Sequence, residues 1–253
     1  MSDYKVEPET NKEYFQGEVR ECLPANPTHS SQHSRVVKVL GAYAKPEYTV
    51  DIDLLTRQDK NNNFASDVCL RWRGIDPATE DRYLEEVAVE IKATQRAGDL
   101  KERARLMAQR GVRRVFAIPV KGDKAGDNLV AGPLLEWQPE LDDWKTWGED
   151  ELLEDRCLTR PLRIKALLDA VVAEEAIATA VLASNLPIVV KHNEEMENRG
   201  MRKSLVLMLS TRGFEVDENA RERIETCSDE RILVRWIERA VSAGSVDEIF
   251  DDA

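Results

Sequence analysis

The stretch LEEVAVEIKATQRAGDLKERARLMAQRGVRRVFAI, residues 84–118, decides the expected fold. Residues 84–93 and residues 112–120 are two mainly apolar runs, and each is predicted to form a strand. Between them, residues 99–110 carry apolar side chains at helical spacing, and Gly111 follows as the residue favoured just past a helix. A strand, a helix and a strand in this order predict two neighbouring parallel strands joined by a right-handed crossover.

The sequence before this unit predicts more of the same sheet. Residues 32–43 have an apolar stripe at helical spacing and end before Pro46, which stops the helix. Residues 48–55 alternate apolar and acidic side chains, as a half-buried strand does, and residues 65–72 are predicted to form another strand. The expected fold class is therefore α/β, with a mixed central sheet flanked by helices.

Three segments are expected along the 253 residues. Residues 1–14 are polar and expected to be loose, residues 15–150 form the α/β domain, and residues 151–253 form an acidic, all-helical C-terminal region. The helices predicted in this region cover residues 162–184, as one long helix or two short ones, residues 194–209 and residues 218–243.

The composition is that of a globular protein, with 42% hydrophobic and 33% charged residues. No apolar run approaches the roughly 18 residues that a membrane span needs, and the charged N-terminus has no apolar signal region. The four cysteines are scattered, without the spacing of a zinc site. We therefore expect a cytoplasmic protein with reduced thiols and no membrane partner.

Charge is unevenly distributed along the chain. Residues 1–130 hold 21 basic and 21 acidic residues, whereas residues 131–253 hold 15 and 27, so the net charge of −12 lies in the second half. Residues 92–114 alone contain eight basic residues and two acidic ones. Because salt confines surface fields to about 8–10 Å, such a basic face can meet a polyanion on an acidic protein. Nucleic acid is therefore not excluded as a partner.

The candidate chemistry lies in Asp67, on one predicted strand, and in Glu90-Ile91-Lys92, on the next. Alternate residues of a strand face the same side, so Glu90 and Lys92 share one face. Two carboxylates from adjacent strands suit Mg²⁺, and a nearby lysine can hold a phosphate oxygen or polarise the attacking water. The alternative is that Glu90 and Lys92 form an exposed or salt-bridged pair, with Asp67 in a turn.

An acidic residue followed, after a gap, by Asp/Glu-x-Lys at the end of a strand resembles the PD-(D/E)XK nuclease superfamily, and the wider pattern is similar to its Uma2 branch of restriction-endonuclease-like proteins. The matching positions are His33, Asp67-Val68, Val89-Glu90-Ile91, Asp99, Arg103 and Gly111-Val112. The chain departs from the pattern at Ser66, where the family usually has proline, and keeps Lys92 in the ordinary position of the superfamily. The resemblance covers roughly residues 15–135.

The resemblance implies a metal-dependent endonuclease acting on nucleic acid, with DNA expected over RNA. Asp67, Glu90 and the Ile91 carbonyl would bind Mg²⁺ or Mn²⁺, and Lys92 would act on the water or the phosphate. His33 would contact a metal-bound water or a phosphate, the alternative being a surface or capping residue of its helix, and Gln95 would orient substrate or water. The proposed phosphate contacts are Arg96, Lys101, Arg103 and Arg105, whose alternative is an ordinary solvated helix face.

Glu18 could supply the further carboxylate that many members of the superfamily place before the core sheet, or could be an exposed glutamate. The main rival function is a catalytically inactive module with the same fold, which recruits a protein partner through its C-terminal helices. A homodimer is also plausible, because many nucleases of this superfamily are dimers. A hydrolase of small phosphorylated substrates is a third alternative, which the basic helix disfavours.

Overall fold

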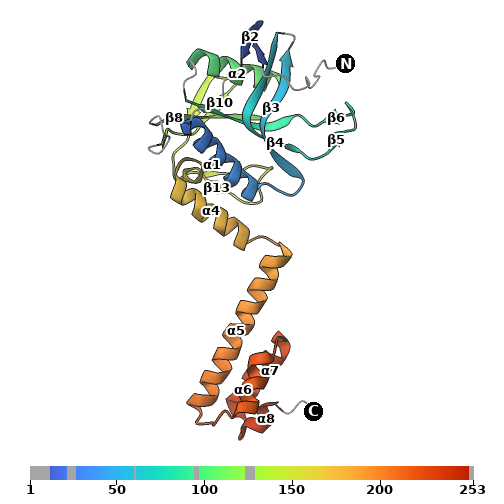
Figure 1. Cartoon of the computed structure of the whole chain (residues 1–253), viewed down its shortest axis with the longest axis vertical. Helices are drawn as coiled ribbons and strands as arrows, with labels where there is room; N and C mark the ends of the chain where they lie inside the picture. The colour runs from blue at the N-terminus through green and yellow to red at the C-terminus, as the bar shows by residue number, and fades with distance from the viewer. Residues whose placement is uncertain (1–11, 22–26, 60, 94–96, 123–128, 251–253) are drawn as a thin grey trace. The chain divides into compact units, whose positions relative to one another are not determined.

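The computed structural model describes residues 12–21, 27–59, 61–93, 97–122 and 129–250. The chain divides into two compact units, Met1–Ala180 and Val181–Ala253. The first unit holds a mixed sheet with helices on its faces, which agrees with the expected α/β architecture (Figure 1). The second unit consists of helices with a core of their own.

The central sheet has the strand order β11-β10-β8-β7-β4-β1-β2, with β3 paired to β4 and β9 paired to β8. Its strands are β1 (Lys12–Phe15), β2 (Glu18–Glu21), β3 (Tyr48–Asp59), β4 (Asn62–Trp72), β7 (Glu85–Lys92), β8 (Arg114–Lys121), β9 (Val130–Ala131), β10 (Leu135–Gln138) and β11 (Asp143–Thr146). A small hairpin, β5 (Ile75–Asp76) and β6 (Asp81–Arg82), lies outside it.

The predicted parallel crossover is confirmed. β7 and β8 are parallel, in register from Val87–Arg114 to Lys92–Pro119, and α2 (Ala97–Arg110) connects them. Gly111 ends the helix with φ +116, a backbone conformation that favours glycine. The predicted boundaries differ from the observed ones by a few residues, and β3 extends four residues further than expected.

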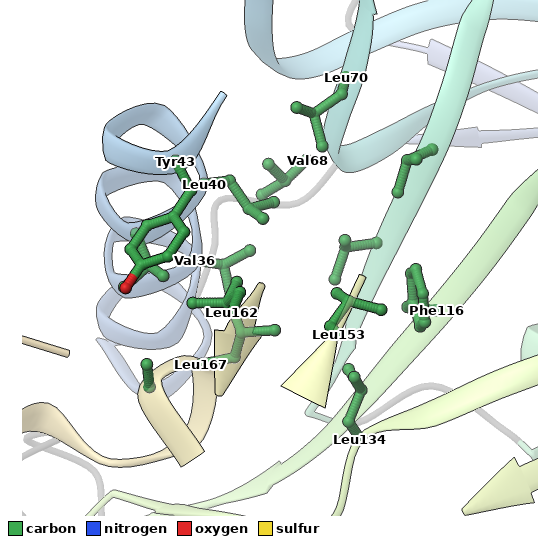
Figure 2. Close-up of a cluster of buried hydrophobic side chains, with 14 of the residues drawn as sticks. Val36, Leu40, Tyr43, Val68, Leu70, Phe116, Leu134, Leu153, Leu162 and Leu167 are labelled. Atoms are coloured by element: carbon green, nitrogen blue, oxygen red, sulfur yellow. The ribbon is translucent and has the colours of Figure 1, made fainter. Parts of the chain in front are cut away.

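The two faces of the sheet have separate cores. Helix α1 (Pro27–Tyr43) covers one face, where Val36, Leu40 and Tyr43 pack towards Val68 and Phe116 (Figure 2). On the other face, α2 buries Leu100, Ala104 and Met107, the last two in a second cluster with Phe64, Ala88 and Val115. Alternation along β7 serves both cores, because Val87, Val89 and Ile91 face α1 while Ala88 and Glu90 face α2.

Residues 151–180 belong to the first unit, so the boundary lies about thirty residues beyond the expected one near residue 150. Leu153, Leu162 and Leu167 complete the core under α1, and the Gln32 side chain donates to the Leu167 carbonyl at 2.7 Å (Figure 2). This region is also not all-helical. It contains the strand pair β12 (Leu152–Leu153) and β13 (Leu162–Arg163) before α3 (Lys165–Leu168) and α4 (Ala170–Leu182).

Two further segments differ from expectation for local reasons. Residues 12–14, expected to be loose, form β1, which pairs with β2 and with Asn63 of β4. Residues 162–184, expected as one long helix or two short ones, begin with strand β13 and continue as the two short helices α3 and α4. The helices are separate because the Asp169 carboxylate accepts the Val171 and Val172 N–H groups at 2.9 and 3.0 Å and so starts α4.

The second unit contains α5 (Pro187–Thr211), α6 (Glu218–Thr226), α7 (Glu230–Ser242) and α8 (Val246–Phe250). Its core includes Leu205, Leu209 and Trp236. Residues 218–243, expected to be helical, form the two helices α6 and α7, because the Asp229 side chain caps α7. In the described parts of the chain no single helix is long and apolar enough to cross a membrane, and only α4 and α5 taken together, bent at their junction, pass that test.

Candidate functional site

Asp67 lies where β4 and β7 cease to pair. The last paired residues of the two strands are Val68 and Val89, so Asp67 and Glu90 are the next residues on each. Beyond this last pair, β7 is hydrogen-bonded to a side chain of β4, because Asp67 Oδ2 accepts the Ile91 N–H. The two acidic residues predicted from the sequence are therefore neighbours at the end of this pairing, where the charge of Asp67 acts on Glu90.

Glu90 is fully buried on the α2 side of the sheet. Its Oε2 accepts from the Arg103 Nε at 3.1 Å, whereas Oε1 is buried and has no hydrogen-bond partner among the described residues. Burial raises the pKa of Glu90 to about 8, against the opposing effect of Arg103 and with smaller contributions from the carboxylates of Asp67 and Glu13. A buried carboxylate with one open oxygen is a candidate ligand for a cation.

Arg103 was predicted to contact phosphate from the helix, but its side chain does not lie on a solvated face of α2. Its side chain is 10% exposed and contacts Glu90, the Glu13 carboxylate and the Ala65 carbonyl. Glu13, which the sequence analysis did not single out, brings a carboxylate to Arg103, whereas Glu18, the candidate considered there, is exposed. Only the fold brings Glu13 to Arg103, since ninety residues separate them.

Two histidines of α1 hold Asp67 from the other side. The His33 Nε2 donates to the Asp67 carbonyl oxygen, and the His29 Nε2 lies 3.3 Å from Asp67 Oδ1. The hydrogen bond to Asp67 raises the pKa of His29, against its burial and together with the charges of Asp67 and Asp53. His29 was missed, although its position four residues before His33 places both rings on one helix face.

Asp53 of β3 lies opposite Asp67, between the paired residues Ile52–Val68 and Leu54–Ser66. Its φ of +47 is unusual for an aspartate within a strand, and such strain gathers at functional sites. Desolvation raises the pKa of Asp53, the neighbouring histidines oppose this, and Asp67 adds to it. Asp53 is exposed, as the alternation of its strand predicted, and its charge still interacts with those of Asp67 and the two histidines.

Lys92 ends β7, two residues after Glu90, and its side chain is half-buried. Within the described ranges it forms no ion pair. Gln95 and Arg96, expected to orient substrate and to contact phosphate, lie outside the described residues. Asp99 lies in the first turn of α2.

The outer face of α2 meets an acidic turn. Arg105 donates twice to Asp142 Oδ1, at 3.0 and 2.9 Å, and also contacts Glu102, while the Lys101 ammonium lies 3.7 Å from Asp142 and 3.9 Å from Asp143. Lys101 and Arg105 are partly exposed, as a phosphate contact requires. Both side chains, however, already have carboxylate partners.

Replacing Asp142 by alanine tests whether these two cations can serve nucleic acid. Loss of the carboxylate should remove the partner that both side chains share, leaving Arg105 with Glu102 and Lys101 near Asp143. The affinity for a DNA duplex should then rise about 2- to 5-fold at low salt, with a steeper salt dependence. Fluorescence anisotropy over a salt series measures both quantities. Asp150→Ala is the matched control, because it removes an exposed carboxylate paired with Arg163. Equal affinities of the two variants would contradict a phosphate role for α2.

The carboxylate oxygens of this site are chemically suited to bind one divalent cation. Asp67 and the open Glu90 oxygen are hard ligands of the kind Mg²⁺ prefers. Over the residues that the structure describes, no group of three or more His, Cys, Asp and Glu side chains is arranged to hold a metal ion. A cation here would therefore depend on these two carboxylates, with backbone oxygen and water completing its shell.

No family model and no curated protein matches this chain. A solved structure to which it is similar is the crystal structure, at 1.96 Å, of a candidate nuclease of the DUF820 family from Anabaena variabilis ATCC 29413. The identity is 16% and the TM-score is 0.48, over 63% of this chain and 92% of that chain. A likeness at this level assigns neither fold nor function.

Proposed function

We propose that this protein is a metal-dependent endonuclease that hydrolyses phosphodiester bonds, with DNA as the expected substrate and Mg²⁺ or Mn²⁺ as the cofactor. The observation that carries the proposal is the position of Asp67 and Glu90, each next to the last pair of β4 and β7, together with one Glu90 oxygen that is buried without a hydrogen-bond partner among the described residues. Burying a carboxylate oxygen without a hydrogen-bond partner is costly, so the Glu90 Oε1 atom favours a bound cation.

Each residue of the site has a distinct part in this proposal. Asp67 and Glu90 would hold the ion, assisted by the Ile91 carbonyl, and a bound divalent cation supplies Lewis-acid polarisation of the phosphate. Lys92, on the same face as Glu90, would stabilise negative charge on the phosphate or polarise the attacking water. His33 and His29 would keep Asp67 in place, since both contact that residue.

The proposal is tested by incubating plasmid, single-stranded DNA and RNA with the protein and Mg²⁺ or Mn²⁺. We expect metal-dependent cleavage that EDTA and Glu90→Gln both abolish, because each removes the cation from the site. Glu154→Gln makes the same chemical change at an exposed glutamate and should leave cleavage intact. Cleavage that survives in Glu90→Gln would show a contaminating nuclease or another site, and would contradict the proposal.

A second candidate function is a catalytically inactive module of the same architecture that recruits a protein partner through its C-terminal helices. It is favoured by the ion pairs that occupy Lys101 and Arg105, and by exposed apolar residues of the second unit such as Leu207 and Val241. Isothermal titration with Mn²⁺ separates the two. A nuclease should bind the ion through Glu90, whereas the inactive module should not bind it.

A further inference from the structure

Arg103 is a buried cation at the centre of the site, and the proposed function gives it no part. We infer that Arg103 takes the place of a second metal ion, so that the site holds a single divalent cation between Asp67 and the Glu90 oxygen that has no hydrogen-bond partner among the described residues. This inference rests on the proposed function. Arg103 is thus a positioning residue, acting through Glu90 and through β4.

The contacts of Arg103 fix its guanidinium on every side. Nε lies 3.1 Å from Glu90 Oε2, Nη1 lies 3.1 Å from Glu13 Oε2, and Nη2 donates to the Ala65 carbonyl at 2.5 Å. The guanidinium also lies over the Phe64 ring, 4.2 Å from its centroid. Such a planar fork, held by two carboxylates, a carbonyl and an aromatic ring, has little freedom to leave.

Arg103 and Glu13 together also fix the approach to Asp67. Glu13 Oε1 accepts the Ala65 N–H at 3.0 Å, while Arg103 binds the Ala65 carbonyl, so both backbone polar groups of Ala65 are held by this pair. Ala65 precedes Asp67 by two residues on β4. The same guanidinium therefore sets the positions of Glu90 directly and of Asp67 through the strand.

The charges of the site set how many cations it can take. Glu13, Glu90 and Asp67 bring three carboxylates together, and Arg103 lies between the first two. A second divalent ion bound to Glu90 Oε2 and Glu13 would have to occupy the position of the Arg103 guanidinium. The positive charge of the guanidinium would repel such an ion. Glu90 Oε1 is buried without a hydrogen-bond partner among the described residues, and the Asp67 carboxylate contacts the Ile91 N–H and His29 but not Arg103, so these two groups would hold the one ion.

The test counts Mn²⁺ ions by electron paramagnetic resonance of the free ion, with Mn²⁺ alone as the probe. The proteins are wild type, Arg103→Gln and, on the same helix, Arg105→Gln as the matched control. Each is also made with Glu90→Gln, and the ions that remain there are subtracted as weak binding to the acidic surface. We expect one Glu90-dependent ion in wild type and in Arg105→Gln, and two in Arg103→Gln, where Glu13 and Glu90 Oε2 become free.

The outcomes separate this inference from the proposed function. Two ions in wild type, or a single ion in both wild type and Arg103→Gln, would overturn the role of Arg103 and leave the proposed nuclease function standing. No Glu90-dependent ion in wild type would overturn both. If Arg103→Gln does not fold, the wild-type count still decides, and Arg103→Lys, which keeps the charge, should also bind one ion.

Discussion

Replacing Lys92 by alanine is expected to slow phosphodiester cleavage about 10²- to 10⁴-fold while leaving the free energy of unfolding nearly unchanged. Lys92 is half-buried at the end of β7 and, in the part of the chain that the structure describes, forms no ion pair whose loss would weaken the fold. The variant therefore removes a charge beside the reacting phosphate and little else. Single-turnover cleavage and denaturant unfolding measure the two quantities.

Lys121→Ala is the control for this prediction. Lys121 ends β8, the parallel neighbour of β7, and is exposed. Its removal lowers the net charge by the same amount, so a general loss of DNA attraction would slow both variants equally. Equal rates in the two variants would contradict the role of Lys92. Retained Mn²⁺ binding in Lys92→Ala would further show that the lysine acts on the reaction and not on the metal ion.

The parts of the fold that the sequence could predict are those encoded by local pattern. The crossover from β7 through α2 to β8 lies within 37 residues and follows from periodicity and one glycine. The extent of the first unit was not predictable in this way, because Leu153, Leu162 and Leu167 have the same apolar character whether they form helices of a tail or the underside of the core. Their assignment depends on contacts with α1, more than a hundred residues earlier.

The site shows the same division between local and long-range signals. Asp67, Glu90 and Lys92 could be proposed from the sequence because a short motif lies on predicted strands, and His29 could have been noted from its spacing to His33. Arg103 was assigned to the surface, since a charged helix face is usually solvated and nothing local marks the one arginine that points inwards. Its partner Glu13 lies at the far end of the unit in sequence, so the ion pair exists only once β1 joins the sheet.

Breaking the buried ion pair between Glu85 and Arg110 is expected to be the most destabilising change away from the site. The side chains are 2% and 1% exposed and join the start of β7 to the end of α2. Glu85 also accepts from Thr56, and the Arg110 Nε donates to Gln58 at 2.6 Å. Arg110→Met or Glu85→Gln should each cost about 3–5 kcal/mol in the free energy of unfolding, because the remaining partner is left buried and uncompensated. Urea unfolding at pH 7 measures the loss.

The double variant and the pH dependence of the free energy of unfolding show whether this pair stabilises the fold through its charges or through packing alone. Glu85→Gln with Arg110→Met should cost less than the sum of the single changes, by about 1–3 kcal/mol, because neither side chain then leaves an unpaired charge. Despite its burial, the pKa of Glu85 is lowered by Arg110, Thr56 and Arg82. Its contribution to stability is therefore present above the unfolded pKa of about 4.3 and is lost as the pH falls through the lower folded value. The difference between wild type and Arg110→Met should narrow as the pH falls below about 4, whereas a difference that stays constant from pH 7 to pH 3 would mean that Arg110 acts through packing alone.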